Sequence, residues 1–345
     1  MKNISKKKIL VLFCGGTISM HKNEDTGALD IANGADQLFK LEPRLIEIAN
    51  VDVHFIDNID STNMIHTHWE KMVDEIQKEY NNYDGFLITQ GTNTMAYTSS
   101  ALTWALLGIG KPVVLTGAQI PAEIISTDGR NNLVNALRVC TMYLGGVFIV
   151  FGSKIILGCR AKKMSESALD AFGTFNKPDF GEIGVGLLLR DESHPSHSNK
   201  FEIKNGFDDN VVSITLVPGF KPEIINELID KGAKGIVLRG YGSGDVPYDL
   251  LPSLDYSKMK RVPVLITTQC PGGATVLGVN DVGLKALEAG GIQAFDMSME
   301  SMTTKMMWLI KQGTPFDEFG KKMHENLAGE IDTRKAKVIL NKELK

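Results

Sequence analysis

The sequence predicts a two-domain α/β protein whose larger domain is built on a mostly parallel sheet. Three observations support this. Apolar stretches alternate with helical patterns over the first 190 residues, the 345 residues suffice for two domains, and a second, smaller set of strands and helices follows a polar stretch. Strands that alternate with helices pair in parallel. We expect an N-terminal α/β domain over 1–190, a linker over 191–210 and a C-terminal α/β domain over 211–345.

Six strands and four helices are expected in the first domain. The strands are short apolar runs: Ile9–Phe13, Val51–Ile56, Gly85–Ile88, Pro112–Thr116, Gly146–Phe151 and Lys154–Gly158. The helices are Glu42–Ala49, Thr67–Tyr80, Met95–Leu107 and Asn131–Leu144. Asp128 precedes the last helix and is expected to cap it. The polar stretch 20–34 lacks a period, so it is either a lid over the site or a plain surface loop.

The second domain repeats the alternation on a smaller scale. Its expected strands are Val211–Val217, Gly235–Leu238 and Val262–Thr267, and its expected helices are Lys221–Lys231, Val282–Ala289 and Ser301–Lys311. The segment Gly240–Gly244 is rich in glycine. It lacks the Lys-Ser/Thr pair of a P-loop and the acidic residue of a dinucleotide fingerprint, so we expect a tight turn after a strand.

Composition excludes several classes of function. The net charge of −4 argues against binding to nucleic acid, and no apolar run is long enough to span a membrane. The four cysteines are scattered without a CxxC pair, which is typical of reduced cytoplasmic thiols. The apolar run Ile9–Phe13 is too short for a signal peptide, so a cytoplasmic location is expected. His66 and His68 have no third ligand nearby in the sequence, and we expect neither a metal nor a cofactor.

Two of the expected strands run into glycine turns that present a threonine. Thr17 follows the first strand and Thr92 follows the third. Because the carboxyl ends of parallel strands form the edge where ligands bind, these threonines are two candidate nucleophiles of one cleft. The basic stretch 160–165 also follows a strand. Its composition favours a solvated loop, and the alternative is a lysine that points toward Thr92. The hydroxyls of 60–64 could bind a carboxylate or simply cap a helix.

Two of these segments resemble signatures of the bacterial-type L-asparaginase family. Cys14-Gly15-Gly16-Thr17-Ile18-Ser19 resembles the first signature, and Gln90-Gly91-Thr92-Asn93-Thr94-Met95 resembles the second. The likeness runs from about Ile9 to Leu309. Because no signal peptide is expected, the chain resembles the type I, cytoplasmic branch of the family. Further similar segments are Pro112–Pro121, Asn132–Leu137, Gly240–Pro247, Thr268–Cys270 and Asp296–Glu300. The resemblance implies a flavodoxin-like N-terminal domain, a small amide as substrate, and a homodimer or homotetramer.

The resemblance also implies roles for individual residues. Thr17 matches the nucleophile that attacks the side-chain amide, Thr92 matches the threonine that activates or positions water, and Lys163 matches the lysine of a Thr–Lys–Asp relay. Asn93 occupies the relay's acidic position. The implied substrate-binding residues are Ser61 and Thr62 at the α-carboxylate, Gly91, Ala118 and Gln119 around the amide, and Ser243 and Glu300 approaching the site of a neighbouring protomer.

The sequence departs from the family pattern at several of these positions. Asn93 stands where the family has the aspartate that completes the relay and binds the substrate's α-ammonium group, and asparagine carries no charge. Gln90 replaces a histidine, Cys14 replaces a threonine, and Ser126 stands where the type I pattern often has arginine. The family's lid tyrosine has no counterpart, because no tyrosine occurs before Tyr80.

Three interpretations follow from the matches and the departures. The first is an amidohydrolase of the asparaginase fold, acting on asparagine or on an amide without a free α-amino group. The second is a catalytically impaired relative that binds a ligand or a partner. The third is a relative of the asparaginase-like component of the archaeal tRNA-dependent amidotransferase, which is disfavoured because that component carries an extra N-terminal domain and this chain is acidic.

Overall fold

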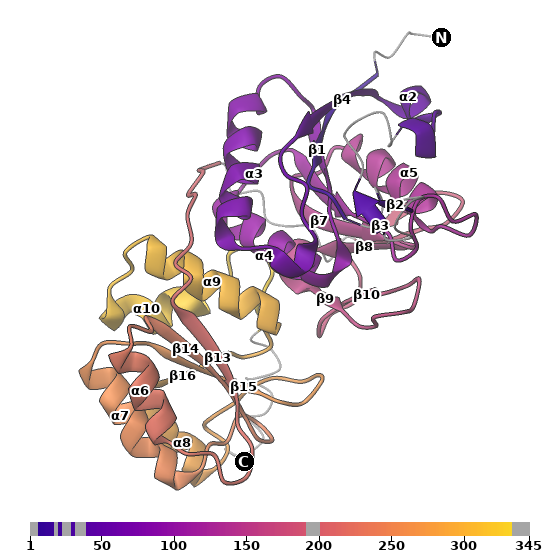
Figure 1. Ribbon diagram of the computed structural model, residues 1–345. Coiled ribbons are helices and arrows are strands. Elements are labelled where there is room, and N and C mark those ends of the chain that lie inside the picture. Colours follow the sequence, from indigo (N-terminus) through magenta and orange to yellow (C-terminus); the bar gives the residue numbers. More distant parts are fainter. Residues whose placement is uncertain (1–5, 17–19, 23–28, 32–38, 191–200, 333–345) are drawn as a thin grey trace. The chain divides into compact units, whose positions relative to one another are not determined.

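The structure is a computed structural model that describes residues 6–16, 20–22, 29–31, 39–190 and 201–332. The chain divides into two compact units, Met1–Asn205 and Gly206–Lys345 (Figure 1). The division lies within the stretch 191–210 that the sequence predicts to be a linker. Part of that stretch, 201–205, belongs to the first unit, where the backbone of Lys204 donates a hydrogen bond to Ala105.

The first unit is organised around an eight-stranded sheet in the order β12-β11-β8-β7-β6-β5-β1-β4. The strands from β4 to β7 are parallel, whereas β8, β11 and β12 pair antiparallel at the other edge. The bounds are β1 (Lys8–Phe13), β4 (Asn50–Phe55), β5 (Gly85–Thr89), β6 (Pro112–Thr116), β7 (Gly146–Phe151), β8 (Lys154–Leu157), β11 (Gly181–Ile183) and β12 (Leu187–Leu189). The mostly parallel α/β sheet predicted from the sequence is confirmed.

The parallel strands follow the flavodoxin-like order, with the first strand between the second and the third. The chain leaves β1 for β4 on one side and then crosses to β5 on the other. Ligands of such sheets bind in a crevice at the reversal, which places the expected crevice at the carboxyl ends of β1 and β5. Every residue of β5 and β6 is buried, because helices cover both faces of the sheet.

In the described part of the first unit, helices cover both faces of the sheet. In Figure 1, α3 (His66–Glu79) and α4 (Met95–Ala105) lie on one side of the strands, and α2 (Leu45–Ile48) and α5 (Gly129–Cys140) lie on the other. The expected start of the first of these helices at Glu42 is wrong. Glu42 precedes Pro43, which disfavours helical backbone at the preceding residue, and α2 begins only at Leu45.

The stretch 20–34 contains regular structure that its sequence did not indicate. Strands β2 (Met20–Lys22) and β3 (Leu29–Ile31) pair antiparallel, so the prediction of an irregular loop is wrong for these residues. Strands of three residues are too short to give a readable alternation of apolar and polar side chains. The rest of the stretch lies outside the described residues, so its role as a lid stays a prediction.

The second unit contains a parallel sheet in the sequential order β13-β14-β15-β16. The strands are β13 (Val211–Thr215), β14 (Gly235–Gly240), β15 (Val264–Thr268) and β16 (Gly291–Gln293), and the helices are α6 (Glu223–Asp230), α7 (Leu251–Met259), α8 (Asp281–Glu288), α9 (Met299–Lys311) and α10 (Phe316–His324). This sequential order has no reversal of the kind that directs ligand binding in the first unit.

A buried ion pair joins α9 to the segment that follows α10. The Lys305 Nζ lies 2.6 Å from the Glu330 Oε1, and both side chains are fully buried. The amine also donates to the carbonyl oxygens of Met323 and Glu325. The carboxylate accepts from the backbone nitrogens of Leu327 and Ala328. Buried charges are tolerated when they are paired and hydrogen-bonded in this way.

No helix in the described part of the chain combines the length and the apolar character that crossing a bilayer requires.

Candidate active site

The two glycine turns of the sequence signatures touch at the crevice between β1 and β5. The backbone nitrogen of Cys14 donates to the carbonyl of Thr89 at 3.0 Å, which continues the pairing of the two strands. Gly16 has a φ of +95°, and a Cβ at this position would lie 2.3 Å from the backbone nitrogen of Gly91. Only glycine allows so close an approach. Thr17 itself lies outside the described residues.

Lys163 reaches the second threonine. Its Nζ donates to the Thr92 Oγ1 at 2.7 Å and to the Asn93 Oδ1 at 3.0 Å. Lys163 ends strand β9 (Ala161–Lys163), which pairs antiparallel with β10 (Phe172–Thr174) and places Lys163 opposite the buried Phe172. The interpretation of 160–165 as a merely solvated basic loop is therefore wrong for Lys163.

The pKa of the Lys163 amine is shifted by its surroundings. Burial lowers the pKa of the amine below its ordinary value, and the carboxylate of Glu166 only partly opposes this effect. A lysine amine becomes a usable general base when its pKa is lowered in this way. Asn93 contributes an amide oxygen, which accepts a hydrogen bond from the amine without stabilising its charge as a carboxylate would.

The hydroxyl of Thr92 is held by a second side chain. It donates to the Gln119 Oε1 at 3.0 Å. The Gln119 Nε2 donates to the carbonyl oxygens of Glu166 and Ala168 at 3.0 and 3.2 Å, and this fixes the orientation of the amide. Thr92 therefore offers a lone pair to Lys163 while its proton points to Gln119. The buried Oγ1 is positioned from two sides.

Ser61 and Asn93 are connected across the crevice. The backbone nitrogen of Asn93 donates to the Ser61 Oγ at 3.2 Å, and the Asn93 Nδ2 donates to the Thr62 Oγ1 at 2.9 Å. Ser61 is buried and lies against Gly91, where a Cβ would come within 2.5 Å of the Ser61 Oγ. The predicted binding residues Ser61, Thr62 and Gly91 are thus adjacent to Thr92 and Asn93.

Within 60–64, Asp60 has the helix-capping role that the sequence offered as an alternative to ligand binding. Its carboxylate accepts from the backbone nitrogen of Thr62 at 2.8 Å at the start of the 3-10 helix η2 (Ser61–Asn63). Helix α3 begins later, after Ile65, so Ser61 and Thr62 do not cap it. Their hydroxyls face the 3-10 helix η3 (Thr92–Thr94) instead.

Asp128 has a role that sequence reasoning missed. It precedes α5, but its side chain does not cap the helix, and that prediction is wrong. The carboxylate accepts from the backbone nitrogens of Gln119 and Ile120 at 3.0–3.1 Å and from the Asn132 Nδ2 at 2.9 Å. Asp128 thereby fixes the segment that contains the buried Ala118 and Gln119. An aspartate before a helix normally indicates a cap, so the sequence carried no signal for this contact.

Comparison with known proteins assigns both halves of the chain. Residues 8–194 match the family model "Asparaginase, N-terminal", and residues 210–323 match "Glutaminase/Asparaginase C-terminal domain". The chain belongs to the asparaginase family. It is a hydrolase of the kind that acts on amides, which confirms the resemblance seen in its two signatures.

Named relatives and a solved structure support this assignment. The chain is 37% identical to the L-asparaginase of Thermococcus kodakarensis over 94% of its own length and 99% of the relative's. It is 31% identical to L-asparaginase 1 of Escherichia coli over 95% of its length and 99% of the relative's. L-asparaginase I of Vibrio cholerae superposes with a TM-score of 0.85 at 31% identity, covering 95% of this chain and all of that one.

Two residues implied by the asparaginase resemblance lie in the second unit. Ser243 belongs to the turn after β14, where the backbone nitrogen of Tyr241 donates to the carbonyl of Asp245, so the tight turn predicted there is confirmed. Glu300 lies in the first turn of α9 and is buried. Their expected approach to the site of a neighbouring protomer stays a prediction.

Among the described residues, His66 and His68 are not part of a group of three potential metal ligands. The His68 Nδ1 hydrogen-bonds to the backbone of Ile65, and its Nε2 lies 3.6 Å from the Asp57 carboxylate. Within the described ranges of this asparaginase-family chain, three side chains elsewhere bring ligand atoms together, namely His54, Glu75 and Glu79.

Proposed function

We propose that this asparaginase-family protein hydrolyses a side-chain carboxamide, of L-asparagine or a related amide, to a carboxylate and ammonia. The contact of 2.7 Å between the Lys163 Nζ and the Thr92 Oγ1 carries the proposal. A partly buried amine of lowered pKa lies beside a buried hydroxyl. A protein that only binds a ligand does not need such an acid–base pair, so this arrangement favours an enzyme. Relatives named L-asparaginase support the choice of substrate.

The proposed reaction proceeds by acyl transfer. The Thr17 hydroxyl attacks the carboxamide carbon while backbone N–H groups stabilise the oxyanion. The hydroxyl's proton passes to the amide nitrogen, the C–N bond breaks, and ammonia leaves. Water, activated by Thr92 and Lys163, then attacks the Thr17 ester and releases the acid. Gly16, which precedes Thr17 in the sequence, packs against Gly91.

Substrate binding is assigned to the residues around this pair. The hydroxyls of Ser61 and Thr62 would hold the α-carboxylate, and Gly91 would allow the substrate to approach the backbone. The carbonyl of Ala118 and the side chain of Gln119 would line the amide end. We propose that Ser243 and Glu300 complete the site of a neighbouring copy in a homodimer or homotetramer. We also propose a cytoplasmic location, which agrees with the scattered cysteines.

A second candidate substrate is an amide without a free α-amino group. The observation that favours it is the neutral Asn93, whose oxygen accepts from Lys163 and whose nitrogen donates to Thr62. This arrangement offers no charge to an α-ammonium group. A charged hydrogen bond is worth about 1.5–3 kcal/mol, so its loss would weaken recognition of asparagine by about 10- to 150-fold.

Ammonia release from a panel of amides tests the proposal. Asparagine, glutamine, N-acylated asparagine and succinamate are compared in the wild-type protein and in Thr17→Ala. We expect at least one amide to be hydrolysed by the wild type and none by the variant, because the variant lacks the attacking hydroxyl. If no amide yields ammonia above the variant while asparagine still binds, the protein is a ligand-binding relative and the enzymatic proposal is refuted.

Asn93→Asp is expected to strengthen the recognition of asparagine. The new carboxylate can pair with the α-ammonium group, so KM for asparagine should fall by about 10- to 150-fold. The carboxylate also favours the charged form of Lys163 and raises its pKa. Since the neutral amine acts as the base, the rising limb of the pH profile of kcat should move to higher pH. Steady-state kinetics across the neutral and alkaline pH range measure both effects.

Succinamate is the matched control for Asn93→Asp, because it lacks only the ammonium group of asparagine. Its KM should stay unchanged or rise in the variant. A KM for asparagine that is unchanged or higher would show that the neutral amide does not limit recognition of the ammonium group.

A further inference from the structure

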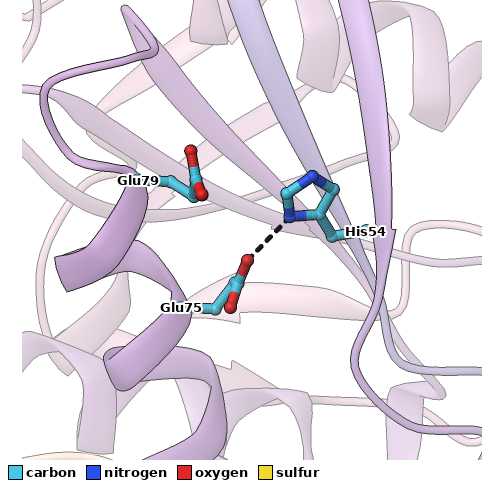
Figure 2. A group of neighbouring side chains, drawn as sticks. All are labelled: His54, Glu75 and Glu79. Atoms are coloured by element: carbon cyan, nitrogen blue, oxygen red, sulfur yellow. Dashed lines mark hydrogen bonds and ion pairs between the residues drawn. The ribbon is translucent and has the colours of Figure 1, made fainter.

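A group of three potential metal ligands lies between strand β4 and helix α3, outside the proposed active site. His54 comes from β4, and Glu75 and Glu79 come from α3 (Figure 2). Figure 2 shows the three side chains pointing toward one another, and one ligand atom from each lies within 4.8 Å of the other two. The His54 Nδ1 and the Glu75 Oε1 are 2.7 Å apart. The group plays no part in the amide chemistry proposed above.

The positions of the two glutamates favour a cation between them. Residues four apart lie on the same face of a helix, and like charges at this spacing repel each other. The side chains of Glu75 and Glu79 are only 18% and 14% exposed, so water screens this repulsion poorly. A cation bound to both carboxylates would relieve this repulsion.

We propose that His54, Glu75 and Glu79 bind a divalent transition metal ion, with zinc as the representative. One imidazole and two carboxylates are a donor set that zinc accepts, and three protein ligands leave a coordination position for water. At zinc–ligand distances of about 2.0–2.2 Å, tetrahedral ligands lie about 3.3–3.6 Å apart. His54 and Glu75 must move slightly apart. The widest pair is no more than 4.8 Å apart, so it must close by at most about 1.5 Å, which side-chain rotations can supply. By binding His54 on one side and the two glutamates on the other, the ion would cross-link the edge strand β4 and helix α3.

Lys78 is the competitor of the metal. Its Nζ lies 3.1 Å from the nearer carboxylate oxygen of Glu75 and 3.6 Å from the Glu79 Oε1. Its side chain is 64% exposed and can swing into solvent when an ion enters. The other oxygen of Glu79 accepts a hydrogen bond from the Asn82 Nδ2 at 2.8 Å, which helps to orient the carboxylate. The ammonium of Lys78 thus supplies the positive charge that the metal would replace.

Zinc titration of the intact, EDTA-treated protein tests the proposal. Calorimetry should give one zinc ion per chain that is lost in His54→Gln, and zinc should raise the Tm of the wild type but not of that variant. His54→Gln and Glu79→Gln should each weaken zinc binding by at least about 100-fold, since the loss of groups that merely support a ligand weakens binding by about 10- to 100-fold. Lys78→Gln should strengthen binding about fivefold, because an exposed ion pair contributes at most about 1 kcal/mol.

His66→Gln is the matched control, because His66 begins the same helix and lies outside the group. Its zinc affinity should equal that of the wild type. Two outcomes would overturn the proposal. In one, neither the wild type nor Lys78→Gln binds zinc. In the other, His54→Gln binds zinc as tightly as the wild type, which would place the ion elsewhere in the chain.

Discussion

Replacing Lys163 with methionine is expected to lower kcat for amide hydrolysis by about 10²- to 10⁴-fold. Methionine preserves much of the side chain's apolar packing but removes the amine that lies 2.7 Å from the Thr92 Oγ1. In the proposed reaction this amine activates the water that attacks the acyl-enzyme, so its loss should slow that step. Binding should change less than turnover, because Ser61 and Thr62 still hold Asn93 in place. Steady-state ammonia release measures the loss.

Rapid-quench kinetics separate the two half-reactions of the Lys163→Met variant. If Lys163 serves only the second step, one equivalent of ammonia should appear in a burst and turnover should then stall. If it also serves the first step, the burst should be absent. Lys162→Met is the control, because the neighbouring amine lies over the ring of Phe175 and should leave kcat unchanged. Near wild-type turnover in Lys163→Met would contradict the assigned role.

Lys305→Met is expected to lower the free energy of unfolding of the second unit by about 3–5 kcal/mol. The substitution leaves the Glu330 carboxylate fully buried without its counter-charge, and it removes the donor for two backbone carbonyls. Trp308, which lies about one turn after Lys305 on α9, reports on this region. Urea unfolding followed by the ¹⁹F resonance of fluorotryptophan at this position measures the change.

Lys285→Met is the matched control for the buried pair. Lys285 pairs with Asp281 at 2.7 Å on the surface of α8. An ion pair in such a position contributes at most about 1 kcal/mol. The double variant Lys305→Met/Glu330→Met should recover much of the lost stability, since apolar side chains can replace a buried pair. A loss below about 1 kcal/mol in Lys305→Met would show that the pair does not stabilise the unit.

The sequence predicted best the elements whose burial dictates their composition. The runs Pro112–Thr116 and Gly146–Phe151 match β6 and β7 in full, because a strand buried on two faces must be continuously apolar. Strand β9 was missed, since three residues ending in two lysines carry no periodic signal. Helix α10 was also missed, although the buried Phe319 and Met323 show helical spacing.

Some features of the candidate site could also be predicted from the sequence, whereas others depend on packing. The two threonine turns could be predicted because each follows a strand, and the flavodoxin-like order then brings those strand ends together. The partner of Thr92 could not be predicted from spacing, because Lys163 lies 71 residues further along the chain. The position of 160–165 after a strand left a lysine near Thr92 as an alternative, and the family resemblance singled out Lys163. The contacts of Asp128 and the convergence of His54 with Glu75 and Glu79 depend on packing that no local pattern encodes.

The close packing of Gly16 and Gly91 limits what the two signature motifs can reveal about activity. A Cβ at Gly16 would meet the backbone of Gly91, and a Cβ at Gly91 would meet the Ser61 side chain, so packing favours both glycines even in a relative that has lost the chemistry. Surveys of genomes that rely on these motifs will therefore count inactive paralogues among the enzymes. A search for degenerate members should score the hydroxyl and amine positions separately from the glycine framework.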